Sequence, residues 1–176
     1  PSGIHNAEHY STAYDMALIA QYCMQNEAFR NIVAMPSCTI EPTDKYEKRY
    51  FKNTNDLLDS KSKYYYENAI GIKTGFTTQA KNCLISASQK DNMELITVVL
   101  GAEATADGRS GRYVDTINLF DYGFANYKIQ KINIANAEVQ SLTIKNATKE
   151  TKNLPVILKD NISALVPSNI NLSDLK

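Results

Sequence analysis

The sequence has 176 residues, of which 43% are hydrophobic and 22% are charged, as is ordinary for a globular protein. Nineteen basic residues balance nineteen acidic ones, so we expect no binding to nucleic acid and no electrostatic attraction to an anionic membrane. No stretch approaches the roughly 20 apolar residues that a membrane-spanning helix needs, and no secretory signal opens the sequence. Because the sequence starts at Pro1 without an initiator methionine, we expect a cut inside a longer protein.

The cysteines and histidines do not predict a metal site. Cys23, Cys38 and Cys83 lack zinc-site spacing, and their odd number leaves at least one unpaired within the chain. Small buried hydrophobic side chains are the favoured interpretation of these cysteines. His5 and His9 have a spacing that could hold a metal on a helix, but surface imidazoles are favoured because no glutamate ligand pattern accompanies them. We therefore expect neither a metal nor another cofactor.

Two helices are expected near the start of the chain. Apolar residues recur with helical spacing over residues 12–23, and Thr12 with Asp15 resembles a capping box. A second short helix is expected over residues 26–33. It should end before Pro36, which cannot continue a helix.

The next part of the chain has no clear period. We expect residues 37–63 to form strand fragments within a long connection, and such connections inside compact domains tend to be functional. The tyrosine run at residues 64–66 could form a platform for stacking on sugars. Packing within a strand or loop is the favoured interpretation of this run.

Three strands are expected over residues 69–76, 82–89 and 93–101. The turn at residues 90–92 is so short that the last two strands should be antiparallel neighbours. The last strand is apolar at consecutive positions, which predicts a central strand of a sheet.

The chain then changes from helical to β-rich texture. A helix is expected over residues 107–127, with its firm start near Arg112. Short alternating and apolar runs follow, and roughly 50 residues is thin for an independent core. We therefore expect an α+β fold, an antiparallel sheet with packed helices followed by a small β-rich module, with domains at residues 1–128 and 129–176. The second domain is expected to be truncated or to lean on the first.

The triplet Lys73-Thr74-Gly75 carries the clearest chemical signal. On its own it is common, and Lys73 could be an ordinary lysine on a strand edge. A substrate with a free carboxylate needs a cation and a hydroxyl donor, which Lys73 and Thr74 can supply. Because neighbouring side chains of an ideal strand point to opposite faces, we expect a distorted strand or an intermediary group. Gly75 would let a peptide add along the strand edge, and the Phe76 amide could donate to an oxyanion.

The surroundings of this triplet resemble the D-Ala-D-Ala carboxypeptidases, a family of low-molecular-weight penicillin-binding proteins (peptidase family S11). The similarity covers residues 3–127, and its separate blocks occur in the family's order. These blocks are residues 3–5, 11–17, 71–78, 82–88 and 95–102. The resemblance implies the C-terminal half of the catalytic domain, which is part of a penicillin-binding/β-lactamase-like transpeptidase fold.

The resemblance also implies a role for each matched residue. Lys73 would be the third-motif lysine that engages the carboxylate of the substrate or of a β-lactam, and Thr74 and Gly75 would complete that motif. The backbone amide of Phe76 would be half of the oxyanion hole. Thr77 would lie at the edge of the cleft.

The nucleophilic serine and its base lysine are not expected in this chain. The family's first two motifs should lie before residue 1, and no Ser-x-Asn occurs anywhere in the sequence. Ser60 and Lys63 form a literal Ser-x-x-Lys, but they lie in a charged, polar stretch rather than at the start of a buried helix. We interpret them as a chance match on a solvated loop. The missing N-terminal half is thus an expected partner, and the fragment alone is expected to be inactive.

The function implied by the resemblance is that of a secreted, wall-facing bacterial hydrolase. It would remove the terminal D-Ala from peptidoglycan stem peptides through a serine acyl-enzyme, and it would bind β-lactam antibiotics. No metal is needed, and any membrane anchor would lie outside this chain. The alternatives are a β-lactamase or transpeptidase of the same superfamily, or a non-catalytic peptide-binding fragment.

Overall fold

The structure is a computed structural model that describes residues 3–132, 138–146, 148, 152–157 and 159–170. It contains two compact units, residues 1–124 and 125–176. Helices and an antiparallel sheet make up the first unit, which confirms the expected α+β fold.

The two expected helices are confirmed at the start of the first unit. Helix α1 (Ala13–Met24) begins with a capping box, in which Asp15 N donates to Thr12 Oγ1 at 3.0 Å and Thr12 N donates to the Asp15 carboxylate at 3.2 Å. Helix α2 (Glu27–Ala34) begins after Asn26, whose side chain accepts a hydrogen bond from the third residue of the helix.

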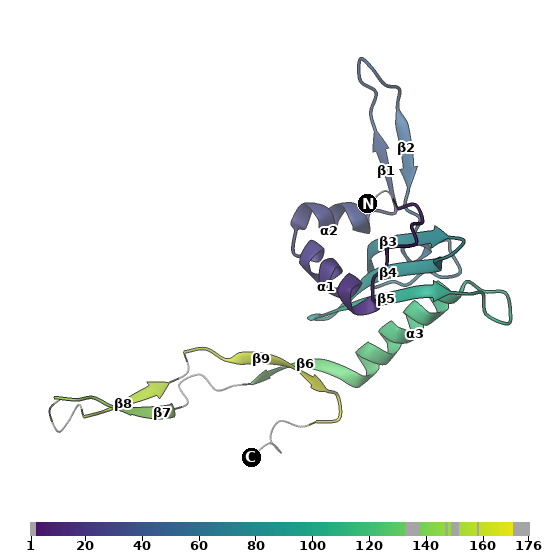
Figure 1. The fold of residues 1–176 in the computed structure, drawn as a ribbon. Helices are drawn as coiled ribbons and strands as arrows, with labels where there is room; N and C mark the ends of the chain where they lie inside the picture. The colour runs from purple at the N-terminus through teal and green to yellow at the C-terminus, as the bar shows by residue number, and fades with distance from the viewer. Residues whose placement is uncertain (1–2, 133–137, 147, 149–151, 158, 171–176) are drawn as a thin grey trace. The chain divides into compact units, whose positions relative to one another are not determined.

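The sheet consists of three antiparallel strands in the order β3-β4-β5. Its strands are β3 (Ala69–Thr77), β4 (Lys81–Lys90) and β5 (Met93–Ala102). A separate hairpin of β1 (Ser37–Ile40) and β2 (Arg49–Lys52) projects away from the sheet (Figure 1). The irregular connection expected over residues 37–63 therefore contains this β-hairpin.

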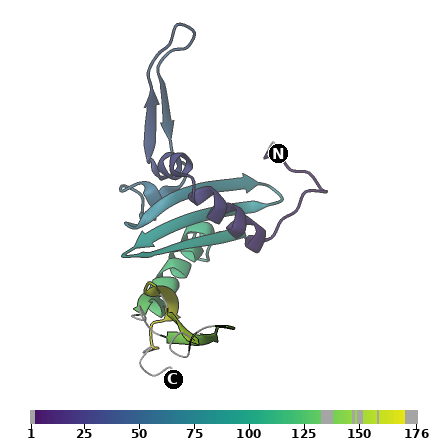
Figure 2. The same ribbon diagram turned by 90° about the vertical axis from the view of Figure 1, so that its left-hand side faces the viewer.

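Strand β5 lies at an edge of this sheet, although its sequence predicts a central strand. Among the described residues it pairs with β4 alone. The two-sided apolar character has another cause, because α1 and α2 cover one face of the sheet and α3 (Gly111–Asn126) covers the other (Figures 1 and 2). Burial of both faces does not require a neighbour along both edges, so the expectation of a central strand is wrong for this chain.

Alternate residues of β4 serve two separate hydrophobic clusters. Leu84 packs with Tyr113 and Phe120 in the cluster that α3 covers. Ala87 packs with Ile72 and residues of α1 in the cluster on the opposite face. The strand period of two thus places the sheet between two helical layers.

Gly71 lies where α2 packs closely against β3. Its φ is +142°, and a Cβ there would lie 2.8 Å from Val33 Cγ2. Its carbonyl oxygen accepts hydrogen bonds from the side chains of Ser86 and of Asn55, the latter at 3.0 Å. Both donors are buried, so this contact fastens the edge strand to the interior.

The second unit is β-rich in the part of the chain that the structure describes. Its two antiparallel pairs are β6 (Tyr127–Ile132) with β9 (Ile162–Pro167), and β7 (Glu138–Thr143) with β8 (Asn153–Ile157). Its identity as the start of a separate domain at residue 129 stays a prediction. None of the described helices is both long and apolar enough to cross a membrane.

Replacing Gly71 with alanine should lower the free energy of unfolding by about 2 kcal/mol, because the new Cβ combines an unfavourable φ with a close contact. Chemical denaturation measures this loss. Gly75→Ala on the same strand is the control, because its Cβ would lie at an ordinary 3.6 Å from Cys83 Cβ. Equal losses for the two variants would contradict the explanation.

Stability should also depend on Tyr66 at high pH. Desolvation by burial, followed by the hydrogen bond from Tyr66 Oη to Asp121 Oδ1 at 2.9 Å, raises the pKa of Tyr66 to about 12. An unfolded tyrosine ionises near a pKa of about 10. The stabilisation is therefore complete below pH 10 and is lost as the pH rises towards 12.

The measurement is the unfolding free energy across this pH window. Tyr66→Phe should make its decline shallower, whereas Tyr65→Phe, at the exposed neighbouring tyrosine, should leave it unchanged. An unaltered slope in Tyr66→Phe would rule out this contribution.

Candidate functional site

The ammonium of Lys73 and the hydroxyl of Thr74 lie together on β3. Lys73 Nζ donates to the Thr74 carbonyl oxygen at 2.9 Å and to Thr54 Oγ1 at 3.3 Å, and it lies 3.5 Å from Thr74 Oγ1. Thr54 Oγ1 and Thr74 Oγ1 are 2.6 Å apart. An ideal strand would point the side chains of Lys73 and Thr74 to opposite faces. Here Thr54 is the intermediary group, because its hydroxyl contacts both the Lys73 ammonium and the Thr74 hydroxyl.

Thr54 is held in place by its two asparagine neighbours. Asn53 Nδ2 donates to the Val33 carbonyl at 3.1 Å, which ties the segment to the end of α2. Asn55 is 1% exposed, and its Nδ2 donates to the Gly71 carbonyl of β3. The segment that carries Thr54 is therefore fixed to both of its neighbours in the fold.

Helix α3 fixes the same segment from the other side. Tyr113 Oη donates to the Thr54 carbonyl at 3.0 Å and accepts from Asp56 N at 3.2 Å, at the start of the 3₁₀ helix η1 (Asp56–Leu58). Desolvation by burial raises the pKa of Tyr113, so the hydroxyl keeps the proton that it donates. Its ring stacks on Tyr64 with centroids 4.7 Å apart. Packing is thus confirmed for this member of the tyrosine run.

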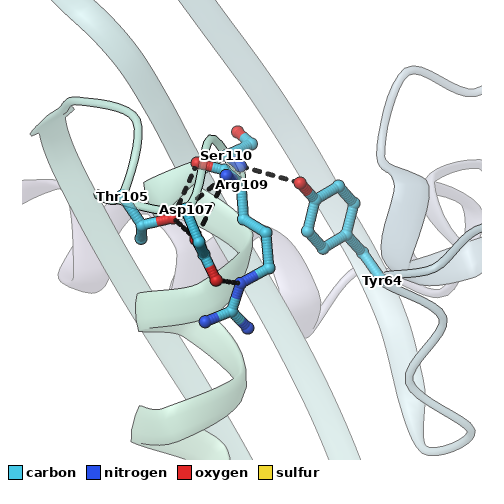
Figure 3. A network of polar contacts seen from close by, with 5 residues as sticks. All are labelled: Tyr64, Thr105, Asp107, Arg109 and Ser110. Carbon is cyan, nitrogen blue, oxygen red and sulfur yellow. Dashed lines mark hydrogen bonds and ion pairs between the residues drawn. The ribbon is translucent and has the colours of Figure 1, made fainter.

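The loop between β5 and α3 is closed by its own polar groups (Figure 3). The Thr105 hydroxyl contacts the Asp107 carboxylate, which also accepts from Arg109 Nε at 2.7 Å. The hydrogen bond from Thr105, and then those from Arg109, lower the pKa of Asp107, so this carboxylate is ionised near neutral pH. Ser110 N donates to Tyr64 Oη at 2.7 Å. These contacts fix the loop that leads into α3.

Arg112 in the first turn of α3 adds a second cation near the triplet. Its Nη1 lies 3.5 Å from the Gly75 carbonyl oxygen, and its guanidinium lies 4.9 Å from the centre of the Tyr113 ring. Within the described part of the chain, its buried Nε has no hydrogen-bond partner. Nη1, rather than this buried Nε, is thus the atom that brings the positive charge to Gly75. The sequence predicts Arg112 only as the start of a helix, because nothing in the local sequence indicates that this start lies beside β3.

The remaining residues of the expected site follow along the same strand. Phe76 pairs with Asn82 of β4 and exposes 67% of its surface. Thr77 Oγ1 accepts from Ala80 N at 3.0 Å, which closes the turn after the strand. Thr77 also lines a pocket of about 510 Å³ with residues 3–6, 8 and 9. The outer edge of β3 has no strand partner among the described residues.

The histidines and cysteines are not part of a metal-binding group. Among the described residues, no group of three or more His, Cys, Asp or Glu could hold an ion. His5 and His9 are exposed residues that line the pocket at Thr77. Cys23 and Cys83 are half-buried, and Cys38 is exposed. The expectation of a buried cysteine is therefore wrong for Cys38.

The Ser-x-x-Lys sequence lies in turns that follow η1. Ser60 and Lys63 are both exposed, and Lys63 Nζ lies 5.1 Å from the centre of the Tyr64 ring. A serine and a lysine on one face of a helix are what the family motif requires. These two residues lack that arrangement, in agreement with a solvated loop.

Comparison with known proteins identifies the family. A profile of the D-alanyl-D-alanine carboxypeptidase family matches residues 1–104. The D-alanyl-D-alanine carboxypeptidase DacF of Bacillus subtilis is 29% identical over 177 residues, which cover all of this chain and 42% of that protein. That of Streptomyces sp. strain K15 is 34% identical over 127 residues, which cover 70% of this chain and 40% of that protein. The chain thus spans less than half the length of these relatives.

Solved structures agree with this identification. Penicillin binding protein 5 of Haemophilus influenzae superposes with a TM-score of 0.67 at 25% identity, over 94% of this chain and 44% of that one. The fold is therefore that of part of a penicillin-binding protein, and the chain belongs to the D-alanyl-D-alanine carboxypeptidase family.

Proposed function

We propose that the protein containing this chain is a serine D-alanyl-D-alanine carboxypeptidase that acts on peptidoglycan stem peptides. This chain would supply the part of the site that binds the terminal carboxylate of the substrate. One observation carries the proposal: the Lys73 ammonium lies within 3.5 Å of the Thr74 hydroxyl on a strand whose outer edge has no partner among the described residues.

Carboxylate binding follows from the charges around the triplet. The cation of Lys73 contacts the Thr74 carbonyl oxygen, that of Arg112 contacts the Gly75 carbonyl oxygen, and Thr74 adds a hydroxyl donor. Hydrogen bonds from charged donors to a carboxylate are stronger than neutral ones. An extended peptide can pair with the outer edge of β3, because its backbone groups would complete an open antiparallel ladder. In this arrangement Lys73 binds and orients the substrate rather than moving the main proton.

The chemistry would be acyl transfer to a serine from the N-terminal half of the domain. The serine oxygen attacks the penultimate carbonyl carbon, and the Phe76 amide donates to the oxyanion that forms. The bond to the terminal D-Ala breaks, and its amine leaves with a proton. Water then cleaves the ester and regenerates the serine. Thr77 would border the substrate where it leaves the strand.

The setting of this reaction would be the bacterial cell wall, outside the cytoplasmic membrane. β-Lactams carry a carboxylate and a strained amide, so they would acylate the same serine while Lys73 and Thr74 hold the carboxylate. The N-terminal half of the domain is the required partner. The present chain alone would bind the substrate poorly and catalyse nothing.

A transpeptidase is the second candidate function. The DD-transpeptidase of Streptomyces K15 is 35% identical, with a TM-score of 0.56 over 68% of this chain. In a transpeptidase an acceptor amine, rather than water, would take the acyl group. Quantifying D-Ala release, amine transfer and β-lactam turnover with the whole protein separates the candidates. Release of D-Ala without transfer supports the carboxypeptidase, whereas rapid β-lactam turnover would indicate a β-lactamase.

A non-catalytic peptide-binding fragment is the remaining alternative. Covalent labelling of the isolated chain by a fluorescent penicillin would exclude it and would place a nucleophile within these residues. Labelling of the whole protein but not of the isolated chain is the expected result.

Substituting Lys73 with alanine in the whole protein should slow acylation by benzylpenicillin about 100-fold, because a hydrogen bond to a charged group is worth up to about 3 kcal/mol. The rate can be followed by stopped-flow fluorescence. Folding should be nearly unaffected, since Lys73 is exposed. The control is Lys52→Ala, at an exposed lysine that pairs with Asp59, which should acylate normally. Normal acylation of Lys73→Ala would exclude the proposed role.

A further inference from the structure

Thr54 makes two contacts that the proposed function does not explain. Its side chain is exposed, so it adds little to the core. Its hydroxyl nevertheless lies between the Lys73 ammonium at 3.3 Å and the Thr74 hydroxyl at 2.6 Å. We infer that Thr54 is a positioning residue that orients the Thr74 hydroxyl proton towards the carboxylate of the substrate. This inference rests on the proposed function, because it assumes that Thr74 donates to that carboxylate.

The ammonium fixes the direction of its own hydrogen bonds, whereas either hydroxyl oxygen could donate in the contact between Thr54 and Thr74. An ammonium has only donors, so Thr54 Oγ1 must accept from Lys73. Once it accepts there, its own proton is available for the short contact with Thr74 Oγ1. When Thr74 donates its proton to the carboxylate of the substrate, its oxygen can only accept in that contact, so Thr54 is then the donor. Lys73 Nζ lies closer to Thr54 Oγ1, at 3.3 Å, than to Thr74 Oγ1, at 3.5 Å.

This order matters because a carboxylate can only accept hydrogen bonds. If Thr74 instead donated to Thr54, its lone pairs would face the carboxylate and repel it. In the proposed arrangement Thr54 donates to Thr74, which keeps the proton of Thr74 for the carboxylate. Such pre-orientation lowers the cost of ordering the site at binding.

The backbone of Thr54 is fixed independently of its hydroxyl. Asn53 is bonded to the end of α2, Asn55 to the Gly71 carbonyl, and Tyr113 to the Thr54 carbonyl. None of these contacts uses Thr54 Oγ1. Removing the hydroxyl alone should therefore leave the segment in place, which makes the proposal separable from a role in folding.

The test is benzylpenicillin acylation of the whole protein carrying Thr54→Val, which replaces the hydroxyl with a methyl group of similar size. We expect acylation to slow about tenfold, the loss that corresponds to one hydrogen bond of ordinary strength. Thr54→Ser keeps the hydroxyl and should stay within about twofold of the unmodified protein. Thr39→Val on the exposed hairpin controls for adding a valine, and its rate should not change.

Two further measurements distinguish positioning from a structural role. In a Thr74→Val background, Thr54→Val should cause no additional loss, because the hydroxyl that it orients is already gone. The methyl ester of benzylpenicillin, which lacks the carboxylate, should acylate Thr54→Val and the unmodified protein at equal rates. Melting temperatures should agree among all variants.

Each contrary result has a definite meaning. Unchanged acylation in Thr54→Val, additive losses in the double variant, or an equal loss with the ester would overturn the inference and leave the proposed function intact. Failure of Thr54→Ser to retain activity would also overturn it, even if the valine variant were unstable. Absence of acylation in the unmodified protein would instead reject the proposed function, and the inference with it.

Discussion

The candidate site depends on the hydrogen bonds that the carbonyl oxygen of Gly71 accepts. This oxygen accepts from two buried side chains, those of Asn55 and Ser86. These bonds attach the inner part of β3 to the interior, while its outer edge stays without a strand partner in the described residues. Because Thr54 precedes Asn55, the same attachment places a hydroxyl beside Lys73. A buried polar contact of this kind is stable only when its donors and acceptors are paired, and here the pairing also fixes the geometry of an exposed site.

The regular elements could be predicted from the sequence because local patterns determine them. The capping box at Thr12 and Asp15, and the apolar runs of the last two strands of the sheet, appear in the structure where their patterns indicate. The position of β5 within the sheet could not be predicted. Apolar residues on both faces of a strand indicate that both faces are covered, but they give no information about neighbouring strands. An edge strand between two helical layers therefore has the same sequence pattern as a central strand.

The site was predictable only in part, for a similar reason. Lys73, Thr74 and Gly75 are adjacent in the sequence, so a motif can identify them. Thr54 and Arg112 contact this triplet from parts of the chain that are distant in sequence. Thr54 lies in a connecting segment, and Arg112 lies at the start of a helix. Their roles depend on tertiary contacts, such as those that Asn53, Asn55 and Tyr113 make, and no local period encodes these. A local motif can therefore indicate the strand proposed to hold a substrate, but not the groups that tertiary contacts bring beside it.

Gly75 shows how the demands of folding and of ligand binding can be told apart at a single position. Inside the chain a methyl group would meet only the Cβ of Cys83, at a comfortable distance. Libraries of the whole protein randomised at this codon and sorted for soluble expression should therefore accept several small residues, whereas the same libraries sorted by capture on immobilised β-lactam should return glycine. The difference between the two enriched populations would show whether an incoming backbone needs the space at this position.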